Sequence, residues 1–120
     1  MIDKINLAEK FASFSDHYNP RIAGEVNDAY VKLVKLKGDF IWHSHAVEDE
    51  MFLVVRGHLK MHFRDRMVEV GPGEFIIVPR GVEHKPEADV ETEVMLFEPK
   101  TVLNTGDVVN ERTRAELERI

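Results

Sequence analysis

The chain has 120 residues, a length that predicts one domain with a hydrophobic core of its own. It contains no cysteine, which excludes disulfides, thiolate zinc sites and thiol nucleophiles. Its net charge of -6, from 16 basic and 22 acidic residues, argues against a nucleic-acid-binding protein, because such proteins normally carry a basic face.

Residues 1–28 are predicted to form an N-terminal arm with one short helix. Asn6 suits the N-cap of a helix that reaches Phe14, because its side-chain oxygen can accept a hydrogen bond from the first turn. Apolar side chains would then share one side of this helix. Any helix should end before Pro20, since proline disfavours helical geometry in the residue that precedes it.

The cellular location is predicted from the same arm and from the apolar runs of the chain. The arm carries charges of both signs early and lacks the apolar core of a signal peptide. The longest apolar run, Met51 to Val55, is far too short to cross a bilayer. We therefore expect a soluble cytoplasmic protein that does not contact a membrane.

Residues 29–99 show the pattern of an all-β domain. Short segments rich in Val, Ile, Leu and Phe are separated by Gly, Pro or Asp, and seven or eight such strands are typical of a sandwich or a closed barrel. Apolar and polar residues alternate most clearly over 58–64. The continuous apolar runs 51–55 and 75–78 predict strands that are buried on both faces. The large apolar side chains expected in the core are Trp42, Phe52, Phe75, Met95 and Phe97.

Residues 100–120 are predicted to form a polar C-terminal tail with a helical turn or two at its end. Thr113 would cap a helix over 113–120, with Glu116 completing a capping box. We expect the tail to pack against the domain, because solvent would not favour its apolar residues. These are Val102, Leu103, Val108, Val109, Leu117 and Ile120.

Four side chains form a candidate metal site. His43 and His45 are two residues apart, so on a strand they would project to the same face and could reach one ion. Glu50 lies far enough beyond them for the chain to turn and begin another strand, and His84 follows a tight turn that could deliver a fourth ligand. Three imidazoles and one carboxylate suit a divalent transition metal: manganese, iron, nickel, zinc or copper.

The spacing of these residues resembles the two motifs of the cupin superfamily. The first motif is a glycine, five residues, His-x-His, three or four residues, a glutamate, six residues and a glycine. The chain matches it with Gly38, His43, His45, Glu50 and Gly57, with four residues in place of five after the first glycine. The second motif ends in Pro-x-Gly, two residues, a histidine, three residues and an asparagine. The chain matches it with Gly73, Pro79, Gly81 and His84, and has Ala88 in place of the asparagine.

This resemblance implies a double-stranded β-helix, or jelly-roll, barrel over residues 29–99, extended by short helices in the N-terminal arm and the tail, within one domain of residues 1–120. It is closer still to small bacterial cupins described as mannose-6-phosphate isomerase-like. It also implies His43, His45, Glu50 and His84 as metal ligands and a homodimer. The apolar content of residues 1–14 and 102–120 gives the dimer a physical motive.

Several residues near the motifs have competing interpretations. Glu48 or Asp49 could replace Glu50 as the carboxylate ligand, but only Glu50 is followed by six residues and a glycine. His58 and His62 lie on the polar face of an alternating strand, and a solvated surface role is favoured for both. Arg80 could reach an anionic ligand from its loop, and an exposed arginine is the favoured interpretation.

Two functions fit a small-molecule ligand or substrate held in such a barrel. The first is a metal-dependent enzyme, either sugar-isomerase-like or dioxygenase-like. The isomerase version needs a base, and no second carboxylate or lysine can be assigned to that role from the sequence. The second is a non-catalytic module that binds or senses a small ligand through the same metal. A third option is that the metal is structural and the chain works through oligomeric contacts.

Overall fold

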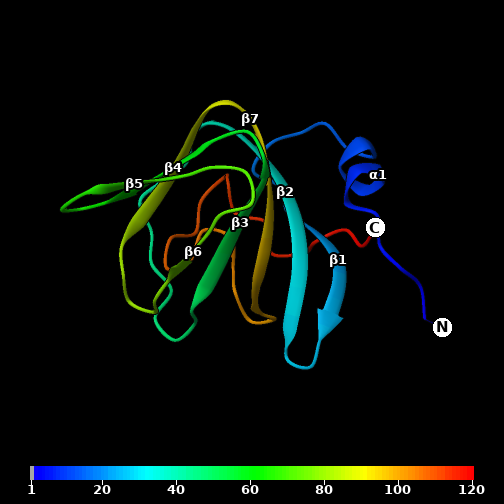
Figure 1. Cartoon of the computed structure of the whole chain (residues 1–120). Helices are drawn as coiled ribbons and strands as arrows, with labels where there is room; N and C mark the ends of the chain where they lie inside the picture. The colour runs from blue at the N-terminus through cyan, green and yellow to red at the C-terminus, as the bar shows by residue number, and fades with distance from the viewer. Residues whose placement is uncertain (1) are drawn as a thin grey trace.

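The computed structural model describes residues 2–120, which form one short helix and seven strands (Figure 1). The elements are α1 (Leu7–Ala12), β1 (Arg21–Val26), β2 (Ala29–Asp39), β3 (Glu50–Arg56), β4 (Leu59–Phe63), β5 (Met67–Val70), β6 (Phe75–Val78) and β7 (His84–Pro99). Among the described residues no helix has the length and apolar character needed to cross a membrane. The predicted all-β jelly-roll domain is confirmed.

The long strand β7 joins two parts of the barrel. Its first residues, 84–87, pair with β4, which in turn pairs with β5. Its later residues lie between β2 and β3 in an antiparallel sheet of order β1-β2-β7-β3-β6. In Figure 1 the β4–β5 hairpin extends away from this sheet. The side chains packed between the two parts are Val34, Leu36, Phe52, Val54, Leu59, Met61, Val94 and Leu96.

The N-terminal arm contains the predicted helix and also a strand that the sequence did not reveal. The side chain of Asn6 caps α1 by accepting from the Glu9 N–H at 3.0 Å, and Phe11 is almost fully buried against the sheet. The additional strand, β1, forms a hairpin with β2. Its two-residue turn contains Asn27 with a φ of 50°, a conformation that asparagine tolerates better than most residues.

The C-terminal helix predicted over 113–120 is wrong. The Thr113 hydroxyl does not cap a helix but bonds the Thr105 hydroxyl at 2.7 Å. The end of the chain is extended instead, and the Ile120 N–H donates to the Ile22 carbonyl at 3.0 Å. The outer edge of β1 has backbone N–H and C=O groups that no other strand pairs with. The extended tail hydrogen-bonds to these groups at Ile22, which a helix could not do.

The prediction that 75–78 is buried on both faces is also wrong, as is the core assignment of Phe75 and Phe97. Phe75 is 58% exposed, Ile77 54% and Phe97 40%, whereas Val78 is buried. An antiparallel sheet often packs only one face on the core, and these side chains point to the other face. The outer apolar patch consists of Val47, Met51, Phe75, Ile77 and Phe97.

Candidate metal centre

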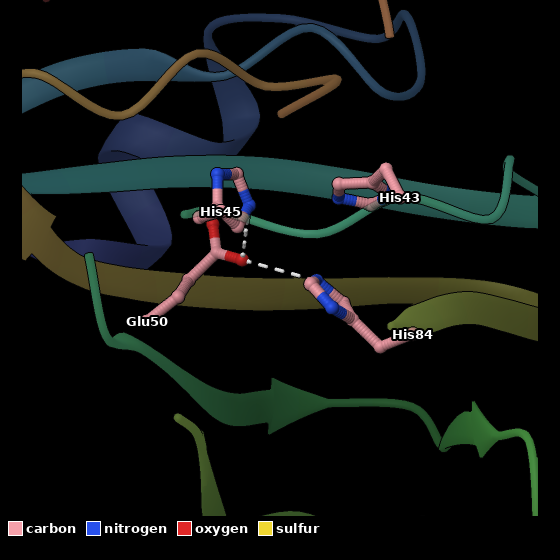
Figure 2. A group of neighbouring side chains, drawn as sticks. All are labelled: His43, His45, Glu50 and His84. Carbon is pink, nitrogen blue, oxygen red and sulfur yellow. Dashed lines mark ion pairs between the residues drawn. The ribbon is translucent and has the colours of Figure 1, made fainter. Parts of the chain in front are cut away.

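The four candidate ligands come from three places that the barrel brings together. His43 lies in the segment after β2 and forms a two-way backbone bridge with His84, the first residue of β7, through N–H···O distances of 3.1 and 2.9 Å. His45 follows two residues later on the same side, and Glu50 begins β3. Figure 2 shows the four side chains pointing toward one another. The structure thus assembles the set that the spacing predicted.

The ligand atoms of this group all lie within 4.8 Å of one another, and every member is buried. Glu50 Oε1 is 3.3 Å from His45 Nε2 and 3.4 Å from His84 Nε2. Among the described residues these three atoms and His45 Nδ1 have no hydrogen-bond partner of good geometry. Buried polar atoms without partners are rare in proteins, so several at one point fit a site built for an ion. The donor set of imidazole nitrogens and one carboxylate is the set that divalent transition metals take.

Backbone carbonyl groups set the tautomer of two of the histidines. His43 Nδ1 donates to the Ile41 carbonyl at 2.9 Å, and His84 Nδ1 donates to the Val82 carbonyl at 2.9 Å. Each ring therefore carries a proton on Nδ1, which leaves Nε2 as the atom that can face an ion. Such contacts orient the ligands in metal sites and make them better donors.

The protonation states of His43 and Glu50 also suit metal binding. Burial, together with the neighbouring His84, lowers the pKa of His43 to about 4. Burial opposes ionisation of Glu50, but contacts with Glu98, His45 and His84 outweigh it and hold the pKa of this carboxyl well below its usual range. Burial likewise acts against the charged form of His45, yet the nearby Glu50 carboxylate raises the pKa of His45 overall. A neutral His43 and an anionic Glu50 are the forms that bind a cation at neutral pH.

The neighbouring acidic residues are engaged elsewhere, which favours Glu50 as the candidate carboxylate. Asp49 accepts from the Arg80 backbone N–H at 2.9 Å and from its guanidinium at 3.2 Å, on the surface. Glu48 accepts from the Thr101 hydroxyl at 2.6 Å. Glu50 alone turns inward, and Arg80 is exposed as predicted.

The other strand histidines lie on the surface. His58 pairs with Glu69 at 3.1 Å, and His62 pairs with Glu87 at 2.8 Å, with both imidazoles partly exposed. Neither belongs to the buried group, so their predicted surface role is confirmed.

The tail holds the segment that carries two of the ligands, a role that the sequence did not reveal. The Ser44 N–H donates to Asp107 Oδ1 at 3.0 Å, and the Asp107 N–H donates to the Ser44 carbonyl at 3.0 Å. Gly106 packs directly against the Ser44 backbone and the His43 ring. The tail therefore fixes the residue between the two candidate ligands, while β7 holds the neighbouring His43 through its backbone bridge with His84.

A small cavity of about 40 Å³ adjoins the ligands. Its apolar wall comes mainly from β2, β3 and β7, with aromatic rings at one side. The lining residues are Tyr18, Pro20, Val34, Leu36, Phe40, His43, Glu50, Phe52, Pro86, Leu96, Glu98 and Asn104. The candidate ligands His43 and Glu50 thus face the same space as the apolar wall.

A buried ion pair lies beside the ligands and was missed by sequence reasoning. Lys32 Nζ and Glu98 Oε1 are 2.8 Å apart, and both residues are 2% exposed. Burial and the adjacent Glu50 carboxylate raise the pKa of Glu98 well above its usual range. A sequence signal existed: Lys32 shares strand parity with buried Val34, and Glu98 with buried Leu96.

Comparison with known proteins places the chain among cupins. A family model described as "Cupin domain" matches residues 31–100. A crystal structure of a cupin-2 domain-containing protein from Shewanella frigidimarina is 46% identical, with a TM-score of 0.79 over 80% of this chain and 94% of that one. Protein NMB1881 from Neisseria meningitidis is 29% identical, with a TM-score of 0.75 over 82% of this chain and all (100%) of that one. The Bacillus subtilis (strain 168) protein YdbB is 33% identical over 95 residues, 78% of either chain.

Proposed function

The chain belongs to the cupin domain family, and on that premise we propose that it binds one divalent transition metal ion through His43, His45, Glu50 and His84 and acts on a small molecule beside that ion. One observation carries the proposal: four buried ligand atoms lie within 4.8 Å of one another. Oxygen and imidazole donors of this kind suit manganese, iron, nickel, copper or zinc. Which of these ions binds depends on the metal available in the cell as well as on affinity.

The chain's own residues prepare this site for chemistry on a bound molecule. When bound, a divalent ion supplies Lewis-acid or redox chemistry at the one or two positions that four protein ligands leave open. Glu50 provides the one negative charge, while the Nδ1 contacts of His43 and His84 hold both rings in place. The apolar side chains of Phe52 and Leu96 exclude water from the space beside the ligands.

The cavity favours a small substrate without a phosphate group. Its volume of about 40 Å³ is well below the roughly 300–1,000 Å³ of common small-molecule pockets. Among the described residues its lining contains no lysine or arginine that could bind a phosphate. These features support a dioxygenase-like reaction on a small neutral molecule over isomerisation of a sugar phosphate.

Metal binding is tested first by elemental analysis of protein purified without an affinity tag, followed by titration with each candidate ion. We expect about one ion per chain for wild type and for His58→Ala, which removes a surface histidine. We expect His45→Ala to lose binding. Full metal content in His45→Ala at unchanged affinity would contradict the four-ligand site.

Turnover separates the enzyme from the alternative, a module that binds or senses a small ligand through the same metal. The loaded protein is incubated with diketones, aromatic diols and sugar phosphates, under air and under nitrogen. Oxygen-dependent loss of a diketone or diol supports the dioxygenase-like enzyme. Saturable binding without turnover supports the module, and turnover of a sugar phosphate supports the isomerase.

The homodimer remains part of the proposal, with a different surface from the one that the sequence suggested. The helix α1 already packs its Phe11 against its own sheet, and the large apolar side chains that the arm leaves exposed, Ile2, Ile5 and Val26, are scattered along it. The outer apolar patch is exposed over β3, β6 and β7, and a second copy of the chain would cover it.

A further inference from the structure

Tyr18 has a backbone conformation that its bulky side chain disfavours. Its φ is 56°, in the left-handed region, where a residue with a large side chain is a genuine outlier. A glycine would adopt the same φ without strain. Strained residues persist only where their surroundings hold them, and they cluster at functional sites. A tyrosine at this position is therefore expected to have a use for its ring.

Contacts with both the backbone and the ring hold Tyr18 in place. Its N–H donates to the Lys35 carbonyl at 2.9 Å, and its hydroxyl donates to the Gly38 carbonyl at 2.6 Å. Its ring stacks on that of Phe40, with the centroids 4.8 Å apart and the planes 5° apart. The Cζ atom of Arg112, from the tail, lies 5.2 Å from the centroid of the Tyr18 ring. The residue is only 9% exposed, so the ring is a fixed surface and not a side chain that swings aside.

The Tyr18 ring forms part of the wall of the cavity beside the candidate ligands. Phe40, on which it stacks, meets the His43 ring edge-on, with the centroids 5.5 Å apart and the planes at 89°. One aromatic layer therefore separates Tyr18 from a candidate ligand. Most of the wall comes from the strands of the barrel, whereas Tyr18 comes from the N-terminal arm, outside the residues 31–100 that match the family model. The barrel alone does not dictate this part of the wall.

The volume of the cavity limits what can lie beside the ligands. It is about 40 Å³, whereas an apolar cavity of roughly 150 Å³ holds one benzene molecule. An aromatic ring would fit only if part of the wall moved, and the contacts of Tyr18 oppose such a movement. The wall is mostly apolar, so a small aliphatic body suits this space.

We propose that Tyr18 is a specificity-determining residue, whose ring limits the ligand of the metal centre to a small aliphatic molecule and excludes one that carries an aromatic ring. This inference rests on the proposed function, and it names the class of molecule that the same site accepts. Of the candidate substrates for a dioxygenase-like reaction, it favours an aliphatic diketone over an aromatic diol.

Two metal-binding compounds with the same head group test this limit. Acetohydroxamate and benzohydroxamate bind a divalent ion through the same pair of oxygen atoms, and one carries a methyl group where the other carries a phenyl ring. Their dissociation constants are measured on the Co²⁺-loaded protein from changes in its visible spectrum. The ratio of the two constants reports the space beside the ion, because the bonds to the ion are the same in both.

Wild type is expected to bind acetohydroxamate at least about 10-fold more tightly than benzohydroxamate, since a pocket without room for a group discriminates against it by this much or more. Tyr18→Gly removes the ring together with the backbone strain, and we expect it to shift the ratio toward benzohydroxamate by about 10-fold or more. Tyr18→Phe keeps the ring and should keep the wild-type ratio. Phe14→Ala removes a ring of the same arm that does not line the cavity, so it should lower the melting temperature without changing the ratio. If Tyr18→Gly does not fold, Tyr18→Leu, which keeps an apolar side chain against Phe40, carries the same prediction.

Several results would overturn the inference. An unchanged ratio in the folded variant that lacks the Tyr18 ring would show that the ring sets no limit, while leaving the metal site intact. The same holds if loaded wild type binds both hydroxamates equally well, or if neither compound binds to any of the loaded proteins. An equal shift of the ratio in Phe14→Ala would assign the effect to a loosened arm and not to the cavity wall. A wild-type protein that binds no Co²⁺ would remove the proposed function and this inference together.

Discussion

Gly106 offers the most direct test of how the tail supports the metal centre. Its φ is +58°, and a Cβ added there would collide with the Ser44 carbonyl oxygen and lie 3.0 Å from the Ser44 carbonyl carbon and 3.1 Å from His43 Cδ2. Ser44 cannot yield easily, because its backbone bonds Asp107 in both directions. The substitution Gly106→Ala must therefore displace the segment that carries His43 and His45.

Two effects of Gly106→Ala can be sized from this geometry. The left-handed backbone costs an alanine about 1–2 kcal/mol, and the forced displacement costs about 1–3 kcal/mol more. Together these lower the melting temperature by roughly 10 °C or more for a domain of this size. Restoring a normal nonbonded separation moves the ligand segment by roughly 1 Å, and we expect metal affinity to fall about 10- to 100-fold.

Two other glycines are matched controls because they are strained in the same way at other places. At Gly57, with φ +99°, an added Cβ would lie 2.8 Å from Thr92 Cα and 2.9 Å from the Glu91 carbonyl oxygen, away from the ligands. Gly57→Ala should therefore destabilise the fold comparably and leave metal affinity unchanged. At Gly73, with φ +80°, an added Cβ would meet no atom of a non-adjacent residue within 4 Å. Gly73→Ala therefore carries only the backbone cost of about 1–2 kcal/mol.

The assay is metal competition by a chromophoric chelator at a temperature at which all three variants are folded, with the melting temperatures measured separately. Weakened binding in Gly106→Ala alone is the expected outcome. If folded Gly106→Ala bound metal as tightly as wild type, the tail would have no part in placing His43 and His45. Equal weakening in Gly57→Ala would show that general destabilisation, and not ligand displacement, controls affinity.

Three further predictions concern metal removal, pH and assembly. Zn²⁺ at 100 times its dissociation constant should stabilise the fold by about 2.7 kcal/mol over the protein in EDTA, and equal melting curves would contradict this. In metal-free protein the pKa of His43 is lowered to about 4, so between pH 6.5 and 4 this residue is protonated in the unfolded chain but not in the folded one. The free energy of unfolding should therefore fall by up to about 3 kcal/mol as the pH drops from about 6.5 to 4. His43→Asn removes this contribution, so urea unfolding of both proteins at pH 7 and 4.5 measures it by difference, and identical pH dependence would refute it. Phe75→Asp in the outer apolar patch should convert a dimer to a monomer in light scattering, while Val90→Asp, an exposed site outside the patch, should not; a wild-type monomer at micromolar concentration would contradict the dimer.

The sequence predicted which residues form the candidate site better than it predicted the packing and tail contacts that hold them. The two-residue spacing of His43 and His45 places both on one face of an extended segment, and the structure brings Glu50 and His84 to them. This succeeded because strand periodicity is local and the motif spacing constrains the loops. The exposure of Phe75 and Ile77 could not be predicted from the local sequence, because the run that contains them is uniformly apolar. Only the packing of the whole barrel decides which of these side chains stay outside.

The role of the tail was out of reach for a related reason. Asp107 bonds Ser44 across 63 positions of the chain, and nothing in the polar sequence around it states which loop it will meet. The predicted helix over 113–120 rested on a capping pattern, and helices of that length are marginal without tertiary packing. The unpaired edge at Ile22 bound the end of the chain instead.

Glu98 bears on the chemistry as well as on the geometry. A sugar isomerase needs a base, and Glu98 is a second buried carboxylate at the cavity that the sequence did not identify. Its environment argues against that role, because Lys32 Nζ holds one oxygen at 2.8 Å and Glu50 is its neighbour on the adjacent strand β3. A base must reach the substrate proton that it removes, and a group engaged on both sides has little freedom to do so. The cavity therefore still favours reactions in which the ion, not a protein base, acts on the substrate.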